Sequence, residues 1–412
     1  MRDRPSLISN YKSFRHGIFY PLILCLFSFL TQFPVGAVAQ SFSDTAHKHK
    51  VAIFTPLYLD SAFDMQGNYR YEKNFPKFIN PGLEFYEGIS MAMDTLQTLR
   101  VRLDIRIYDT KSAQKPISQV LSDPSFDSTE MIIGHVNAEE LHELAQAAEQ
   151  RKIPFINVNF PNDGGIRNNP EFIILNSTLK THCEAIYKFI QRNYATSTIY
   201  FFYRAGAQDD RLRNYFLEIE KSTASVPLKM KYIAIMDPTD PNQFIPYLDS
   251  TRRSICVVGS LDENFGRTIC AAFASLNKTY LTKVFGMPTW DNISEFSQPT
   301  YANQEIYYTT PFYINPNDSL VISIQNAYKN KFYSRPSDMI FRGYETILRF
   351  GRLVQHYGMN LSGSVGEKKY RVFDDFDIQP VFLNRQNMTL DYFENKKLYF
   401  IKKVDGNIVA VY

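Results

Sequence analysis

The sequence predicts an α/β fold made of two successive lobes, each built around a parallel β-sheet. Short apolar runs alternate with helical patterns of about 10 to 15 residues along almost the whole chain. This alternation is typical of right-handed βαβ units, which form parallel sheets. The chain has 412 residues, more than the roughly 250 residues at which a single hydrophobic core stops growing. We therefore expect two lobes.

The first lobe begins with a buried strand over residues 51–54. A loop rich in Asn, Gly and aromatic residues follows from Tyr58 to Pro81. The helix after this loop places five apolar residues on one face, namely Leu83, Tyr86, Ile89, Met93 and Leu96. Further strands are predicted over 101–108, 131–134 and 154–158, with a helix over 138–150.

The second lobe repeats the alternation. Its predicted helices cover 181–192, 210–221, 242–251 and 265–275, and its predicted strands cover 199–203, 228–235, 255–259 and 283–286. We expect residues 305–310 to return as a strand towards the first lobe, followed by a long helical region over 319–357. Residues 378–383 and 398–411 alternate as strands, with a hairpin turn at Asp405-Gly406-Asn407.

Composition and charge exclude several classes of protein. Hydrophobic residues make up 44% of the chain and charged residues 21%, which excludes a disordered protein. Beyond Ala39, basic and acidic groups are equal in number. This balance argues against binding to nucleic acid or to anionic membranes, because both need a concentrated cationic surface.

Residues 1–39 have the pattern of a secretory signal peptide. A basic start precedes an apolar run from Gly17 to about Phe33, and Ala37-Val38-Ala39 supplies a small-x-small cleavage signature. The alternative is an uncleaved anchor, since about 17 apolar residues approach the length that spans a bilayer. We expect cleavage near Ala39, a periplasmic or secreted protein, and no membrane insertion after cleavage.

The cysteines that follow this leader are Cys183, Cys256 and Cys270. They are too few and too scattered for a disulfide framework. Cys256 lies in a predicted strand and Cys270 on the next helix, so the two could face each other. We expect two buried thiols rather than a bond.

Four segments resemble those of one known family. They are KVAIFTPL (50–57), MIIGHVNAEELHELAQAAEQRKIPFINV (131–158), RPSDMIFRGYETILRFGRLV (335–354) and FENKKLYFIKKVDGNIVAV (393–411). Their order resembles that of the type 1 periplasmic binding protein family, which includes the substrate-binding proteins of branched-chain amino-acid ABC transporters and receptor ligand-binding regions.

The resemblance implies two Rossmann-like lobes joined by a three-crossing hinge and closing on a small ligand. After the signal peptide at 1–39, lobe 1 would comprise 50–176 plus 308–355, and lobe 2 would comprise 177–307 plus 356–412. The crossings would lie near 176–178, near 307–310 and past Tyr357.

Ligands of open parallel sheets lie beyond the carboxyl ends of the strands. We therefore expect the ligand-binding residues in the loops after the strands and at the start of the first long loop. They are Tyr58, His135, Asn137, Asn159, Phe160 and Asn162 in the first lobe, and Arg204, Gln208, Asp209, Ser260, Asp262, Thr289, Trp290 and Asp291 in the second. Taken singly, such Asn and Asp residues also favour helix caps and turns. Trp290 could stack on a ligand ring or simply fill the core.

The amino-acid binders of the resembled family hold the ligand carboxylate with hydroxyls and amides of the first lobe, and the ammonium with an acid of the second. Here His135-Val136-Asn137 replaces a serine-rich turn, and Asn159-Phe160-Pro161-Asn162 replaces small residues with a threonine. Pro288-Thr289-Trp290 stands where the acid is expected, with Asp291 one step on. An amino acid is therefore one possible ligand among small polar compounds.

No motif predicts catalysis or a cofactor. The sequence has no G-x-S-x-G elbow, Walker loop or G-x-G-x-x-G turn. His135, Glu139, His142 and Glu143 lack the H-E-x-x-H spacing, and we interpret them as a solvated helix face. The alternating His47-Lys48-His49-Lys50 is interpreted as a cationic segment. We therefore expect no enzyme, no metal site and no cofactor.

We expect an exported solute-binding protein that closes on a small polar ligand, such as an amino acid, for ABC-type uptake through a permease. The alternative is a sensing or interaction module, working with a membrane sensor, a cell-wall fragment or a protein partner. The aromatic residues Tyr58, Phe63, Tyr69, Tyr71 and Phe75 of the first long loop motivate this alternative. They could equally form a lid over the cleft.

Overall fold

The computed structural model describes residues 47–411, apart from 73, 385 and 387. The predicted signal peptide lies outside these residues. The chain divides into the units Met1–His47 and Lys48–Tyr412, and the fold below is that of the second unit. No helix in the described part of the chain is both long and apolar enough to cross a membrane.

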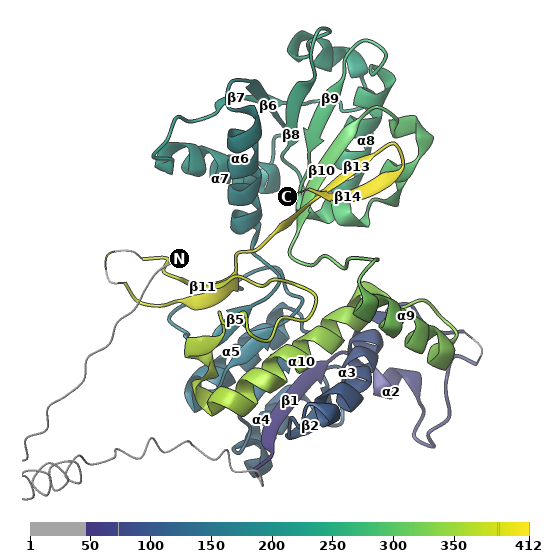
Figure 1. Ribbon diagram of the computed structural model, residues 1–412, viewed down its shortest axis with the longest axis vertical. Helices are drawn as coiled ribbons and strands as arrows, with labels where there is room; N and C mark the ends of the chain where they lie inside the picture. Colours follow the sequence, from purple (N-terminus) through teal and green to yellow (C-terminus); the bar gives the residue numbers. More distant parts are fainter. Residues whose placement is uncertain (1–46, 73, 385, 387, 412) are drawn as a thin grey trace, which may run out of the picture. The chain divides into compact units, whose positions relative to one another are not determined.

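The first sheet contains seven strands in the order β11-β12-β5-β4-β3-β1-β2 within the described residues (Figure 1). All neighbouring strands are parallel except β11 and β12. The strands are β1 (His49–Thr55), β2 (Leu103–Asp109), β3 (Met131–Gly134), β4 (Phe155–Asn157), β5 (Phe172–Ile174), β11 (Ile378–Val381) and β12 (Tyr392–Asn395). Their helices are α2 (Leu59–Ala62), α3 (Asn80–Thr98), α4 (Ile117–Ser122), α5 (Ala138–Arg151), α9 (Ser319–Phe332) and α10 (Asp338–Tyr357).

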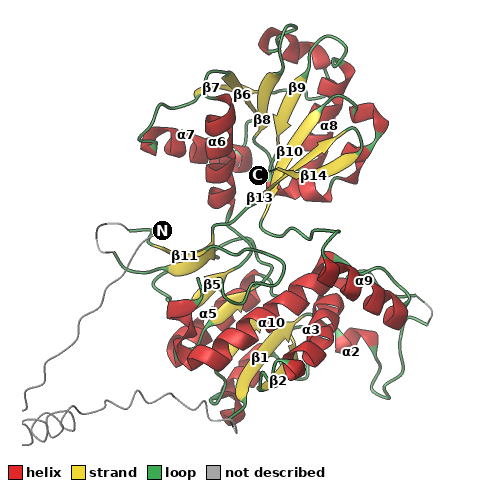
Figure 2. Cartoon of the chain, in the orientation of Figure 1, coloured by secondary structure: helices red, strands yellow, loops and turns green. Residues whose placement is uncertain are grey.

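The second sheet also has seven described strands, in the order β14-β13-β10-β9-β8-β6-β7. They are β6 (Thr198–Tyr203), β7 (Lys229–Ala234), β8 (Ser254–Val258), β9 (Thr282–Phe285), β10 (Glu305–Thr310), β13 (Tyr399–Val404) and β14 (Asn407–Val411), with helices α6 (Leu179–Tyr194), α7 (Ala207–Ser222) and α8 (Glu263–Ser275). Helices flank the strands of each sheet (Figure 2). Two parallel-sheet lobes, as predicted, are confirmed. Short 3-10 turns lie at Pro124–Phe126, Pro241–Tyr247, Pro288–Asn292, Ser294–Ser297, Pro299–Tyr301 and Gly358–Ser364.

Helices α3 and α10 pack unusually closely. A Cβ atom at Gly88 would lie 2.0 Å from the carbonyl oxygen of Ile340, and one at Gly343 would lie 2.2 Å from that of Phe85. This approach rotates the buried face of α3 relative to the prediction. Phe85 and Ile89 are buried, whereas Tyr86 is 38% exposed. The predicted face of α3 is therefore partly wrong, with Met93 exposed as well.

Three other details differ from the prediction. The predicted helix over 242–251 is instead a short 3-10 turn over Pro241–Tyr247 with Pro246 inside it, because proline removes a backbone donor and clashes with the preceding turn. Strand β10 pairs in parallel with β9, so it extends the second sheet before the chain crosses. The predicted long helical region is two helices, because α9 ends at Tyr333, whose φ is 55°.

The C-terminal segment is divided between the two sheets. The sequence assigned 356–412 to the second lobe. Strand β12, which was not predicted, pairs in parallel with β5 of the first sheet, and β11 pairs with β12. Strand β13 pairs with β10 of the second sheet, and β14 closes the predicted hairpin. The lobe boundary in this segment thus falls between Asn395 and Tyr399.

Cys183, Cys256 and Cys270 are buried and unpaired. The expectation of two buried thiols is confirmed for Cys256 and Cys270. Their burial raises the pKa of each thiol, which keeps them protonated and unreactive at neutral pH.

Candidate ligand-binding cavity

A cavity of about 510 Å³ lies at the carboxyl ends of the strands and draws residues from both sheets. Five of the predicted site residues line it, which are Phe160, Asn162, Gln208, Thr289 and Asp291. The loops after β4 and β9 and the first turn of α7 bring them there. This volume suits a small molecule.

Several lining residues were not among the predicted site residues. Asn176, Ser177 and His182 lie on the first crossing and the start of α6, Thr309 lies at the end of β10, and Arg342 lies on α10. Of these residues, only Asn176 and Ser177 could have been predicted from the sequence. They lie on the predicted crossing near 176–178, and hinge segments border the cleft between lobes. Nothing in the sequence pattern distinguishes Arg342 from the other polar residues of an amphipathic helix.

Four predicted residues at the edge of the second sheet bind one another instead. Arg204 donates from Nη1 to Asp262 at 2.9 Å, from Nε to Asp209 at 3.3 Å and from Nη2 to the Ser260 hydroxyl at 3.2 Å. Its guanidinium also lies 4.7 Å from the ring centroid of Phe265. Hydrogen bonds from the α8 amides and from Arg204 hold the pKa of Asp262 below its usual value. Three of the five N–H donors of Arg204 are therefore used inside this network.

Three predicted site residues at the edge of the first sheet also contact neighbouring loop residues instead of lining the cavity. Asn137 and Glu140 form a capping box at the start of α5. Asn159 binds the backbone of Val136 twice, accepting from its N–H at 2.8 Å and donating to its carbonyl at 3.0 Å. Tyr58 packs edge-on against Phe78, with ring centroids 4.9 Å apart. These three residues organise loops, and none lines the cavity.

Trp290 lies in the core of the second lobe. Its side chain is fully buried and packs against Phe296, with ring centroids 5.2 Å apart. Gly286 and Gly266 leave room for the indole, because a Cβ atom at Gly286 would lie 2.0 Å from it. Trp290 therefore fills the core between its cavity-lining neighbours Thr289 and Asp291.

The three crossings between lobes are held together by buried polar groups. Glu394, at the end of β12, accepts hydrogen bonds from the hydroxyls of Thr178 and Thr181 at 2.9 and 2.6 Å. It also pairs with Lys396 at 2.5 Å. This carboxylate thus ties the first crossing to the third.

Beside Glu394, His182 Nδ1 lies 2.7 Å from the Thr309 hydroxyl, which links the first crossing to the end of β10. Complete burial lowers the pKa of His182 to about 3, so its ring is neutral at physiological pH. The hydrogen bond from one ring nitrogen therefore fixes how this cavity-lining imidazole is oriented.

A carboxyl pair lies where the second and third crossings leave the first lobe. Glu345 accepts from the N–H groups of Phe373 and Asp374 at 2.9 and 2.8 Å, and Asp374 accepts from Tyr313 N–H at 2.9 Å. Burial raises the pKa of Asp374 to about 6, and burial together with the Asp374 charge raises the pKa of Glu345 well above its usual value. The pair therefore holds a proton near neutral pH.

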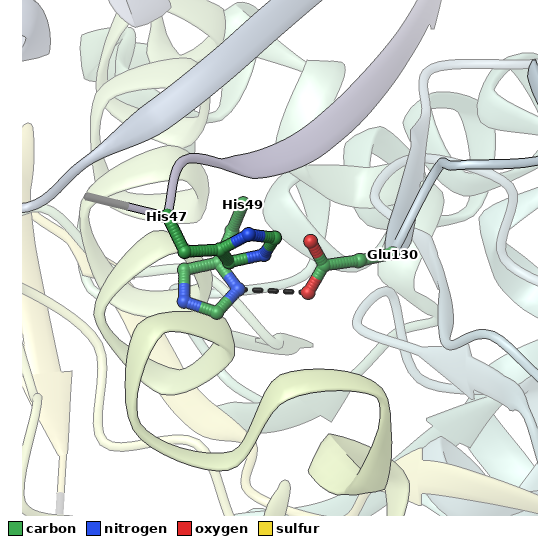
Figure 3. Close-up of side chains that lie close together, drawn as sticks. All are labelled: His47, His49 and Glu130. Carbon is green, nitrogen blue, oxygen red and sulfur yellow. Dashed lines mark hydrogen bonds and ion pairs between the residues drawn. The ribbon is translucent and has the colours of Figure 1, made fainter. Parts of the chain in front are cut away.

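A hydrogen bond between two side chains lies at the start of β1, and neither residue lines the cavity. His49 Nδ1 lies 2.7 Å from Glu130 Oε2 (Figure 3). It anchors the beginning of β1 to the segment that precedes β3.

The first long loop packs on itself. Phe63 and Tyr69 form an isolated β-bridge, and the ring of Tyr69 contacts that of Tyr71 at 5.8 Å between centroids. Met65 is 92% exposed and Phe75 is 47% exposed. No described residue of this loop lines the cavity.

The comparisons with known proteins find only structures. No protein-family profile matches the chain, and no curated protein matches it. A Rhodospirillum rubrum protein assigned as a branched-chain amino acid ABC transporter is 11% identical, with a TM-score of 0.64 over 89% of this chain and 100% of that one.

Two further structures are similar. The ABC transporter substrate-binding protein from Desulfitobacterium hafniense in complex with Leu is 10% identical, with a TM-score of 0.54 over 89% of this chain and 100% of that one. Full-length LpoA from Haemophilus influenzae is 11% identical, with a TM-score of 0.54 over 95% of this chain and 65% of that one. The chain therefore has the two-lobed α/β fold of type 1 periplasmic binding proteins, as the sequence predicted.

Proposed function

We propose that this chain is an exported solute-binding protein whose two lobes close on a small polar ligand. The observation that carries the proposal is the cavity, because residues from the strand ends of both sheets and from the crossings line it together. Ligand contacts to both lobes stabilise a closed form over an open one. The Glu394 and His182 contacts between crossings would set how the hinge bends.

Delivery of the ligand to an ABC-type permease follows from the same proposal. The Rhodospirillum and Desulfitobacterium structures carry transporter names, which supports uptake as the role of this fold here. Export would depend on the predicted signal peptide at 1–39, which lies outside the described residues.

A thermal-melt screen tests the proposal. The chain from Gln40 would be melted with amino acids, short peptides, sugars and cell-wall fragments. A ligand present at 100 times its Kd adds about 2.7 kcal/mol, which raises Tm by several degrees. Small-angle scattering with the hit should show a more compact chain. Melting curves that are unchanged across the whole panel would contradict the proposal.

The second candidate function is an interaction module on the same fold. Exposed apolar side chains of the first long loop favour it, including Met65, Phe75 and Phe78. Changing Phe75 and Phe78 to Ser separates the two candidates, because a solute binder should keep its ligand-induced rise in Tm.

A further inference from the structure

Arg342 differs from the other charged residues of the cavity. It lies one turn into α10, and its guanidinium carbon stands 3.8 Å from the ring centroid of Phe312. Its Nε atom is buried without a hydrogen-bond partner. Across residues 47–411, apart from the three undescribed positions, Arg342 makes no hydrogen bond and no ion pair within 4.0 Å. A buried N–H group that donates to nothing is costly.

Acidic groups near Arg342 balance its charge without using its donors. Asp338, Asp374 and Asp291 attract it electrostatically from beyond ion-pair distance. Asp374 already accepts from Tyr313, and Asp291 also faces the ammonium of Lys403. Burial lowers the pKa of Arg342, but an arginine remains charged at neutral pH. The guanidinium is therefore charged, and no described group accepts a hydrogen bond from it.

A second unpartnered polar atom lies at the same edge of the first sheet. His135 Nδ1 is buried and has no hydrogen-bond partner among the described residues. Burial, together with the charge of Arg342, lowers the pKa of His135 to about 4, so the ring is neutral. Of these two unsatisfied groups, Arg342 lines the cavity and His135 does not, so an external polar group that enters the cavity would meet Arg342.

The rest of the cavity limits what that group is. Its walls carry two guanidiniums, Arg211 and Arg342, against one carboxylate, Asp291. The other walls are amides, hydroxyls and apolar side chains such as Phe160 and Leu261. A planar guanidinium fork matches a carboxylate through two parallel hydrogen bonds. The apolar walls suit an organic acid better than a strongly hydrated inorganic dianion.

We propose that Arg342 anchors a carboxylate of the ligand, so that the cavity selects small organic carboxylates whether or not they carry an ammonium group. The inference rests on the proposed function. It adds the chemical class of the ligand and the residue that binds the carboxylate of that ligand. Arg342 thus supplies by charge what hydroxyls and amides supply in the amino-acid binders that the sequence resembles.

Matched probes test the carboxylate requirement. L-leucine, N-acetyl-L-leucine and 4-methylpentanoate would be compared with L-leucinamide and 4-methylpentanamide by thermal melts and calorimetry, with inorganic phosphate as a separate arm. We expect carboxylates to raise Tm and the amides to leave it unchanged. Equal effects of acids and amides would overturn the inference, as would a response to phosphate alone.

Variants test the residue. Arg342→Gln should weaken carboxylate binding about 10- to 100-fold, the range for loss of a charged hydrogen bond, and Arg342→Lys should lose less. Arg352→Gln is the matched control, since Arg352 lies on the same helix, 4.3 Å from the Tyr370 ring centroid, and does not line the cavity.

Carboxylate binding by Arg342→Gln at full strength would overturn the inference while leaving the proposed function intact. Wild-type chain that binds no member of any panel would remove both. Circular dichroism shows whether each variant is folded. If Arg342→Gln does not fold, the carboxylate affinity of Arg342→Lys is compared with that of the wild-type chain instead.

Discussion

Arg204 and Arg342 are both arginines over an aromatic ring at the carboxyl edge of a parallel sheet, and their surroundings are opposite. Arg204 donates to Asp209, Ser260 and Asp262. Arg342 lines the cavity and donates to no described group. The comparison teaches that position after a strand end does not identify a ligand-binding residue. What matters is whether the side chain still has unused hydrogen-bonding capacity after folding.

The strongest test of this comparison is the stability of the two arginine variants. Arg204→Met should lower the free energy of unfolding by about 3 kcal/mol, because it removes three side-chain hydrogen bonds, one of them to the buried Asp209 carboxylate. Arg342→Met should change it by less than about 1 kcal/mol, since only the contact with Phe312 is lost. Urea unfolding at pH 7.5 measures both, and equal losses would remove the distinction.

Acid titration sharpens the contrast at the first-lobe edge. The pKa of His135 is about 4 in the folded chain and about 6.5 when unfolded. The unfolded state therefore takes up the proton first, and stability is lost as pH falls from about 6.5 towards 4. We expect His135→Gln to remove about 2 kcal/mol of the loss between pH 7.5 and 5.

The control for this titration is His142→Gln, because His142 is exposed on α5. Its urea midpoints should follow those of the wild-type chain at each pH. The contribution of His182 runs in the same direction as that of His135, so some acid sensitivity should remain in every variant. A slope unaffected by His135→Gln would mean that the imidazole is not held neutral.

A smaller loss of stability is expected when Asn137 is changed. In the loop after β3, Asn137 forms its hydrogen bonds with Glu140 of the same chain segment. Asn137→Ala removes the side-chain oxygen that accepts from Glu140 N–H at 3.0 Å. The loss of a helix cap should cost about 1 kcal/mol of stability and leave carboxylate binding unchanged. Asn137→Asp is the paired variant, because aspartate also caps. A loss of binding without a loss of stability would instead make Asn137 a ligand contact.

Most of the fold could be predicted because the central strands of both sheets, such as β3 and β8, are buried apolar runs. Strands β1, β3 and β10 were expected within two residues of their bounds. Strand β12 was missed because Tyr392–Asn395 contains the charged Glu394. Burial of this carboxylate is possible because Thr178 and Thr181 donate hydrogen bonds to it. The face of α3 was misplaced because Gly88 is invisible to an apolar pattern yet permits the contact with α10.

The candidate site was less predictable, for a reason that the arginines illustrate. Asp262 and Asn137 follow strands as ligand-binding residues do, but they follow them as helix caps. Arg342 and His182 reach the cavity from helices, at positions fixed by the packing of α10 and by the crossings. Sequence reasoning placed candidate residues at the carboxyl edge of each sheet, where five of them line the cavity, and three-dimensional neighbours decide which side chains remain available there.

The split C-terminal segment has a consequence for how the protein is made. During synthesis, β5 has no partner on one side until β12 is made, and β10 has none on one side until β13 is made. Both partner strands lie after residue 391. Until then each sheet exposes an unpaired edge. Neither lobe can complete its sheet before this late segment has been made, so the two sheets become complete over the same short stretch of chain.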